Sequence, residues 1–295
     1  MPPAKKTRSL AFRIVRGLFA AIACAYLLMV GAIWYAQAKI IFHPSRTVDV
    51  TPGDLGVKFN NVTLPLNGDQ LAGWWVPSED PQARTLLYLH GNAANVAANV
   101  HHVLRLRSTG LNVFIFDYRG YGYSTGGPPR EKLLYEDAER AWKYLVGERN
   151  IPPADIAIYG HSLGGAVAID LASKHPEAGA LITEGTLTSI ADRADGTLYA
   201  AYLPVRLILT ERFDAISRIG SIHLPKLILQ GEADTMAPPL MARRLYDGAP
   251  DPKQLALIPG GGHEDSAVVN ATAYFAVLNG FLSQYGFKPA GGAAR

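Results

Sequence analysis

Hydrophobic and polar positions divide this chain into an uninterrupted apolar segment near its start and a long stretch of alternating short and long patterned runs. Short β-prone runs predict strands at residues 57–64, 70–76, 85–89, 112–116, 155–159, 180–183, 226–230 and 254–258. Helix-prone runs predict helices at residues 94–107, 131–146, 165–171 and 239–248 and a last helix ending near Tyr285. Strands separated by helices predict an α/β domain with a mostly parallel central sheet and helices on both faces.

Two segments depart from this alternation. The first two strands are joined by the turn signal Asn67-Gly68-Asp69, which predicts an antiparallel hairpin at a sheet edge. Residues 185–223 are too long for a simple crossover and contain the apolar run 200–209, so we expect a small helical cap over the strand ends. The alternative is an extra packed helical layer without a role in substrate binding.

The apolar opening segment predicts a transmembrane anchor at residues 17–38. Residues 17–36 carry no charge, and twenty helical residues span about 30 Å, the thickness of a bilayer core. Five positive side chains precede them, so residues 1–16 are expected to stay cytoplasmic and the domain at 39–287 to be exported. Ala36-Gln37-Ala38 also resembles a signal-peptide cleavage site, and cleavage after Ala38 would give a secreted protein. The apolar run is longer than a typical signal-peptide core, which favours the uncleaved anchor.

Charge and cysteine content exclude other classes of protein. The net charge of +3 arises from 28 basic and 25 acidic residues, but six basic residues and no acidic ones lie within residues 1–39. The remaining 22 basic and 25 acidic residues form no basic patch, so no nucleic-acid partner is expected. The single cysteine, Cys24, rules out an intrachain disulfide and a cysteine-based metal site.

The oligomeric state is left open. The Gly- and Ala-rich tail 288–295 is expected to be disordered.

The motif Gly160-His161-Ser162-Leu163-Gly164 lies between a predicted strand and a predicted helix. In that context G-x-S-x-G is typical of a nucleophile elbow, in which a sharp turn strains the serine and exposes its hydroxyl. Glycines two residues before and after the serine leave room for the neighbouring chain. We therefore interpret Ser162 as a nucleophile. A glycine-rich packing turn is the alternative interpretation.

A serine hydroxyl needs a base within hydrogen-bonding reach and an acid that orients the base. His263 follows the last strand and the flexible loop 259–262, so we expect it to act as the general base and acid. Asp234 follows the strand at 226–230 and is the expected acid, because ligand chemistry collects at the carboxyl ends of strands in open α/β sheets. Glu232 and Glu184 are its rivals.

The intermediate of acyl transfer also needs donors for its negatively charged oxygen. The Leu163 amide follows the nucleophile directly, and the Asn92 amide lies in the loop after the strand at 85–89, with Ala93 as the alternative. His90 in this loop is expected to brace it, and Arg119 is expected to make internal hydrogen bonds rather than bind substrate. This chemistry requires no metal and no cofactor.

Several short motifs together resemble one known family. They are His90–Asn95 (HGNAAN), Asp117–Gly122 (DYRGYG), Gly160–Gly165 (GHSLGG), Tyr202–Arg206 (YLPVR), Arg212–Asp214 (RFD) and Gly261–His263 (GGH). In this combination the chain resembles the membrane-anchored α/β-hydrolases of the bud-emergence type. The resemblance implies the α/β-hydrolase fold, a triad of Ser162, Asp234 and His263, and an oxyanion hole from the Asn92 and Leu163 amides. His161, where such proteins often have Arg, and Glu264, where Asn is usual, depart from the family pattern and affect the rim of the pocket.

These features predict a serine hydrolase that cleaves carboxylic ester or thioester bonds through an acyl-enzyme. An anchor and an apolar cap favour acyl or lipid-like substrates. A peptidase or amidase with the same triad is the alternative within enzymes. From a different class, the chain could be a catalytically inactive, membrane-bound interaction protein, although such a protein has no need of Ser162, Asp234 and His263.

Overall fold

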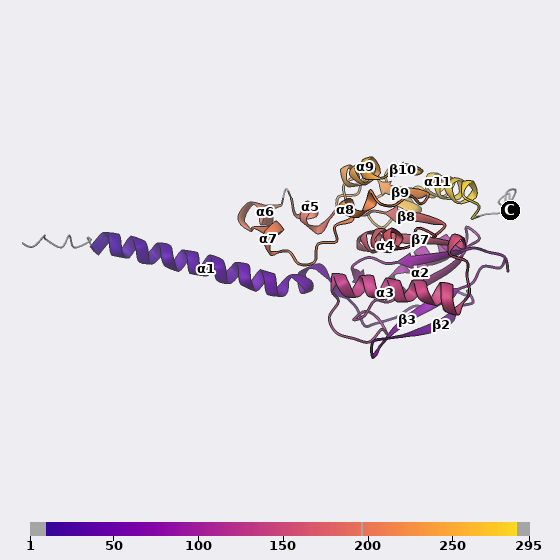
Figure 1. Ribbon diagram of the computed structural model, residues 1–295, viewed down its shortest axis with the longest axis horizontal. Coiled ribbons are helices and arrows are strands. Elements are labelled where there is room, and N and C mark those ends of the chain that lie inside the picture. The colour runs from indigo at the N-terminus through magenta and orange to yellow at the C-terminus, as the bar shows by residue number, and fades with distance from the viewer. Residues whose placement is uncertain (1–9, 196, 288–295) are drawn as a thin grey trace, which may run out of the picture.

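The computed structural model describes residues 10–195 and 197–287, a layered α/β body from which one long helix projects (Figure 1). The predicted disordered tail, 288–295, and the first nine residues of the predicted basic N-terminus lie outside the described residues.

The centre of the body is an eight-stranded sheet. Its strands run in the order β10-β9-β8-β7-β4-β6-β3-β2. All neighbouring pairs from β10 to β6 are parallel, whereas β3 pairs antiparallel with both β6 and β2. The strands are β2 (Asn60–Leu66), β3 (Asp69–Val76), β4 (Thr85–Leu89), β6 (Asn112–Phe116), β7 (Ile156–His161), β8 (Ala180–Glu184), β9 (Lys226–Gly231) and β10 (Lys253–Ile258). The predicted mostly parallel sheet with an antiparallel hairpin at its edge is confirmed. Asn67 and Gly68 form the hairpin turn with φ of 51° and 88°, the left-handed backbone that a two-residue turn needs.

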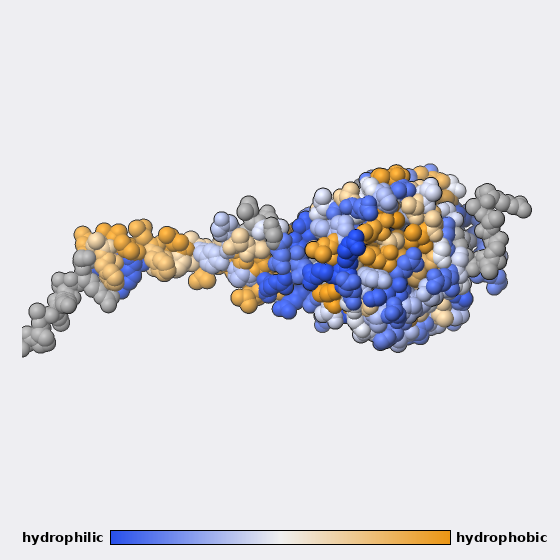
Figure 2. Space-filling model, turned by 90° about the horizontal axis from the view of Figure 1, so that it is seen from above, coloured by the Kyte–Doolittle hydropathy of each residue, from blue (hydrophilic) through white to orange (hydrophobic). Residues whose placement is uncertain are grey.

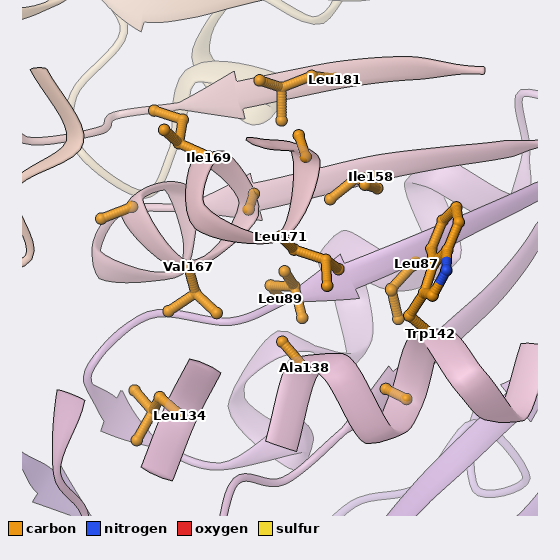
Figure 3. Close-up of a cluster of buried hydrophobic side chains, with 14 of the residues drawn as sticks. Leu87, Leu89, Leu134, Ala138, Trp142, Ile158, Val167, Ile169, Leu171 and Leu181 are labelled. Carbon is orange, nitrogen blue, oxygen red and sulfur yellow. The ribbon is translucent and has the colours of Figure 1, made fainter. Parts of the chain in front are cut away.

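Helices cover both faces of this sheet, as expected. One face carries α3 (Glu131–Lys143), α4 (Leu163–Lys174), α8 (Ala215–Ile219) and α9 (Pro239–Gly248), and the other α2 (Val100–Arg107) and α11 (Ala271–Gln284), with the short α10 (Ser266–Val269) before α11. Because successive side chains of a strand point to opposite faces, Leu87 packs on the α3 and α4 side whereas Leu86 packs against α2 and α11. Figure 3 shows Trp142 of α3 beside Leu87, and Val167 of α4 pointing toward Leu134 of α3.

The helix predicted at residues 94–107 is partly wrong. Its first part is instead β5 (Ala93–Ala94), which pairs in parallel with β1 (His43–Pro44) directly after the apolar helix. Ala94 has a φ of 59°, outside the range of a helix, and the Asn95 side chain then accepts the Ala97 amide to start a 3₁₀ turn, Val96–Asn99. The predicted helix 131–146 similarly ends at Lys143 and continues as a wider turn, Tyr144–Glu148. A further 3₁₀ turn, Pro153–Asp155, precedes β7.

The apolar opening segment forms α1 (Leu10–Ile41), a helix of 32 residues that extends beyond the predicted anchor at both ends. Among the described residues, it is the one helix long and apolar enough to cross a membrane. Figure 2 shows its hydrophobic surface running out from the body. The last turn is different, because Gln37 and Ala38 are buried against the body.

The segment predicted as a cap, residues 185–223, folds into α5 (Ile190–Ala194), α6 (Leu198–Tyr202), α7 (Val205–Ile208) and α8. Figure 1 shows α6 and α7 beside α1, away from the helices that cover the sheet. Hydrogen bonds from Tyr26 and Gln37 hold this part of the segment beside α1.

Candidate active site

Ser162 occupies the sharp turn between β7 and α4, as the elbow motif predicts. Its φ of 55° and ψ of −122° lie in a region that residues other than glycine rarely adopt. A Cβ at Gly160 would overlap the Gly164 carbonyl, and one at Gly164 would overlap the Leu89 carbonyl. The Ser162 amide donates to the Glu184 carbonyl at the end of β8 at 2.8 Å, which holds the turn in place.

His263 and Asp234 lie next to Ser162 although they are far from it in the sequence. The Nε2 atom of His263 is 2.8 Å from the Ser162 Oγ, and its Nδ1 is 2.8 Å from the Asp234 Oδ2. Asp234 follows β9 and His263 follows β10, so two strand ends and the β7 turn converge. The structure therefore brings together the three residues that the sequence singled out.

The carboxyl group of Asp234 is buried and accepts four hydrogen bonds. Oδ1 accepts the amides of Met236 and Ala237, and Oδ2 accepts the Gln230 side chain as well as His263, all at 2.8 Å. Burial alone would raise the pKa of Asp234, but the bonds from His263, Ala237 and Gln230 outweigh it and hold the pKa below its usual value. Because the ionised carboxylate only accepts, His263 carries its proton on Nδ1 and presents a free Nε2 lone pair to Ser162.

The two rival acids do not reach His263. Glu232 directly follows β9 and is exposed. Glu184 is buried and turns to the opposite face, where its carboxylate accepts the hydroxyl groups of Tyr274, at 2.8 Å, and Tyr159. The main chain of Glu184 supports the elbow, whereas its side chain belongs to a separate buried cluster.

The loop after β4 lies beside the nucleophile. A Cβ at Gly91 would be 3.3 Å from the Ser162 Cβ, and both Asn92 and Ala93 line the cavity that contains Ser162. The Asn92 side chain donates to the Ile41 carbonyl at the end of α1 at 2.6 Å, and its carbonyl accepts the His43 amide at 3.0 Å. Leu163 is the first residue of α4, so its amide stands at a helix N-terminus, where donors are free. Both predicted second donors, Asn92 and Ala93, stay candidates.

The cavity at Ser162 measures about 250 Å³ and has a polar wall, of which the part from α2 carries no signal in the sequence. The wall comes from α2, the loop after β4 and the His263 loop, and its charged or polar side chains are Asn92, Asn99, His101, His102, Arg105, His161 and Glu264. The described lining includes no residue from 185–223, and the cap over this site stays a prediction. His161 lies in the wall with its Nε2 3.0 Å from the His263 carbonyl, and thereby supports the loop that carries His263.

His90 and Arg119 have the structural roles expected of them. His90 is fully buried, its Nδ1 is 2.8 Å from the Gly91 carbonyl, and burial lowers its pKa to about 4. Arg119 binds α3 through Asp137, at 2.6 Å, and Glu136, at 2.8 Å. Neither side chain lines the cavity. No group of three or more His, Cys, Asp or Glu side chains placed to hold a metal occurs in the part of the chain that the structure describes.

A strained serine elbow on a mostly parallel sheet defines this protein as an α/β hydrolase, and comparison with known proteins agrees. The family model for serine aminopeptidases of type S33 matches residues 80–213. The α/β hydrolase domain-containing protein WAV2 of Arabidopsis thaliana is 30% identical over 273 residues, covering 84% of this chain and 88% of WAV2. Protein bem46 of Schizosaccharomyces pombe is 32% identical over 263 residues, covering 85% of this chain and 87% of bem46. The chain therefore belongs to the α/β-hydrolase family of WAV2 and bem46, which confirms the resemblance inferred from its motifs.

Among solved structures, the esterase Pf2001 of Pyrococcus furiosus superposes with a TM-score of 0.68 at 22% identity, covering 83% of this chain and 97% of the esterase. At that identity the match establishes the shared fold. The chain is an α/β hydrolase enzyme of the serine-hydrolase type by family and fold.

Proposed function

We propose that this protein hydrolyses carboxylic ester or thioester bonds through a serine-bound acyl-enzyme. The observation that carries the proposal is the unbroken hydrogen-bonded chain from Ser162 through His263 to Asp234, with 2.8 Å at each step. The strained elbow that exposes Ser162 supports it, because such strain persists where function requires it.

In the proposed mechanism, the Ser162 Oγ attacks the carbonyl carbon of the substrate while His263 Nε2 accepts the serine proton. The carbonyl double bond opens, and its oxygen becomes an oxyanion that the Leu163 amide and the Asn92 or Ala93 amide stabilise. Collapse of this intermediate breaks the bond to the alcohol or thiol, which takes the proton from His263. Water then attacks the acyl-enzyme with His263 again as the base, and this step releases the acid and regenerates Ser162.

A peptidase or amidase is the second candidate, and the match to a serine aminopeptidase family model favours it. The proposed triad serves either leaving group, so a matched pair of substrates decides between them. The test compares hydrolysis of an ester and of an amide that carry the same acyl group and differ only in the leaving group. We expect turnover of the ester and not of the amide.

We further propose that α1 is retained as an anchor, with a cytoplasmic N-terminus and the body exported, and that the substrate is acyl- or lipid-like. Cleavage after Ala38 would remove Gln37, which is buried and bonded to the body. Its side-chain oxygen accepts the Thr210 amide at 2.7 Å. This integration of the helix end into the fold supports an uncleaved anchor.

The deciding experiment is labelling with a fluorophosphonate, which reacts with activated serines. Wild-type protein and the control Ser283→Ala, an exposed serine on α11, should be labelled, whereas Ser162→Ala should not. Folding of all three is checked by circular dichroism. Equal labelling of Ser162→Ala, or no labelling of folded wild-type protein, would refute the proposal. Esters of graded chain length then measure the preference for acyl substrates.

A further inference from the structure

In the apolar cap segment, residues 198–209, two large hydrophobic side chains are exposed among those that the structure describes. Tyr202 at the end of α6 is 71% exposed, and Leu207 in α7 is 85% exposed. These twelve residues include a single charged one, Arg206. Exposed apolar surface that carries so few charges is typical of a contact with a membrane or with another protein.

The charge of Arg206 is neutralised by two carboxylates of the neighbouring chain, although its side chain is 61% exposed. Its guanidinium donates to the Asp192 Oδ1 at 2.8 Å and to the Asp195 Oδ2 at 2.6 Å. Asp192 also pairs with Arg244 of α9 at 2.9 Å, which connects the pair to the body. Consecutive residues of a helix point about 100° apart, so Leu207 projects in a different direction from the ion-paired Arg206. The charged and the apolar side chains of α7 therefore point in different directions.

Two sets of hydrogen bonds hold the apolar cap segment alongside α1. Close to the body, the Gln37 side chain donates to the Ile208 carbonyl at 3.3 Å and accepts the Thr210 amide. Farther out along the helix, the Tyr26 hydroxyl donates to the Tyr202 carbonyl at 3.0 Å. Tyr26 and Gln37 are eleven residues apart, about 16 Å along a helix. The segment thus runs outward beside α1 (Figure 1), and the described lining of the cavity at Ser162 includes none of its residues.

The Tyr26 contact gives the depth of the segment if α1 crosses a bilayer. Trp34 and Tyr35 lie where an interfacial aromatic pair would stand, and Tyr26 is eight residues beyond Trp34, about 12 Å deeper. At that depth a helix-end carbonyl has no water to bond with and must find a partner within the protein. The Tyr26 hydroxyl supplies that partner to Tyr202.

We infer that the apolar cap segment is embedded in the bilayer leaflet next to the body and that its partner is the acyl-chain region of the lipid. Tyr202 and Leu207 then face lipid, and the charges of Arg206, Asp192 and Asp195 lie at headgroup level. The inference rests on the proposed membrane anchor, but not on the proposed chemistry at Ser162. It adds a second membrane contact to the anchor and identifies the bilayer as the source of an acyl substrate.

Fluorescence quenching in vesicles tests this inference on the full-length chain. In a Cys24→Ser background, an NBD label is attached at Leu207→Cys or at the control Ser283→Cys on α11, and the protein is reconstituted in phosphatidylcholine vesicles. We expect the label at 207 to emit at shorter wavelength and to be quenched by lipids brominated on their acyl chains. The label at 283 should be quenched by aqueous iodide. Quenching of both labels by iodide to the same extent, without quenching by brominated lipid, would overturn the inference.

Fluorophosphonate labelling of the same samples separates this inference from the proposed function. If Ser162 is labelled and position 207 is exposed to water, the proposed function stands and the membrane inference is refuted. If position 207 is exposed to lipid and Ser162 is not labelled, the membrane inference stands and the proposed function is refuted. A second variant, Leu207→Glu, should lower hydrolysis of a long-chain ester embedded in vesicles at least several-fold and leave hydrolysis of a water-soluble ester unchanged. The control Leu240→Glu, at an exposed apolar position of α9, should change neither. Equal rates of Leu207→Glu and wild type on the embedded ester would also count against the inference.

Discussion

Replacement of Asp234 by Asn tests whether this carboxylate orients His263, and the structure determines how the new amide must lie. Oδ1 accepts two main-chain amides, from Met236 and Ala237, so only the oxygen of the asparagine fits there. The NH₂ group must then take the place of Oδ2 and face His263 Nδ1. A donor at that position requires Nδ1 to accept, which moves the imidazole proton to Nε2 and leaves Ser162 without a base.

The expected loss follows from this change of tautomer. In a triad of this type, an Asp-to-Asn change that keeps the geometry lowers kcat by about 10⁴-fold, equivalent to about 5 kcal/mol of activation free energy. A second, smaller penalty arises because the new NH₂ also faces the Gln230 amide, a donor that already bonds the Ala237 carbonyl at 2.8 Å. We therefore expect a loss of at least 10³-fold, with some loss of stability.

The assay is kcat/KM on a water-soluble ester, with urea unfolding to measure stability. Glu232→Gln is the matched control, because this exposed carboxylate lies two residues away and should change the rate by less than twofold. A folded Asp234→Asn enzyme within tenfold of the wild-type rate would show that the carboxylate does not set the tautomer of His263.

Two further predictions concern glycine geometry and pH. Gly185 has a φ of +57°, and a Cβ there would lie 3.3 Å from His263 Nδ1 and 3.5 Å from Asp234 Oδ2. Gly185→Ala should therefore lower kcat by about 10-fold or more and the free energy of unfolding by about 1–3 kcal/mol, measured by kinetics and urea titration. Burial raises the pKa of Asp117 to about 7, so the folded state holds a proton that the unfolded state releases near pH 4. The free energy of unfolding should thus fall as pH rises through that window. Between pH 5 and pH 8 this fall should be about 2–3 kcal/mol smaller in Asp117→Asn than in the wild type. An unchanged pH profile in Asp117→Asn would contradict the second expectation.

The strands, the elbow at Ser162 and its two partner residues were predictable because each has a local signal in the sequence. A buried parallel strand is a short apolar run, and the elbow needs glycines at fixed spacing around Ser162. Asp234 and His263 could be chosen because each follows a strand, and the ends of parallel strands meet at one edge of the sheet.

Contacts between distant segments were not predictable from such signals. Gln230 of β9 donates a hydrogen bond to Asp234, but a single polar residue in an apolar run does not indicate that role. The short pairing of β1 with β5 depends on a two-residue register that carries no hydrophobic pattern, and this pairing, together with the left-handed Ala94, shortened the helix predicted at 94–107. The position of the cap segment beside α1 depends on hydrogen bonds from Tyr26 and Gln37 to main-chain groups, which leave no signal in the sequence. A sequence pattern shows that a face is apolar without showing what covers it.

The junction between α1 and the body has a mechanical consequence. A single residue, the buried Phe42, separates the end of α1 from β1, and β1 is bonded to the loop beside Ser162. There is no length of flexible chain about which the body could swivel, so helix and body must tilt together. The mouth of the catalytic cavity would thus keep a fixed position and direction relative to α1, and in a bilayer its height above the lipid would follow the tilt of that helix. Thickness of the membrane, by setting the tilt of α1, would then adjust which depth of the leaflet the enzyme can reach.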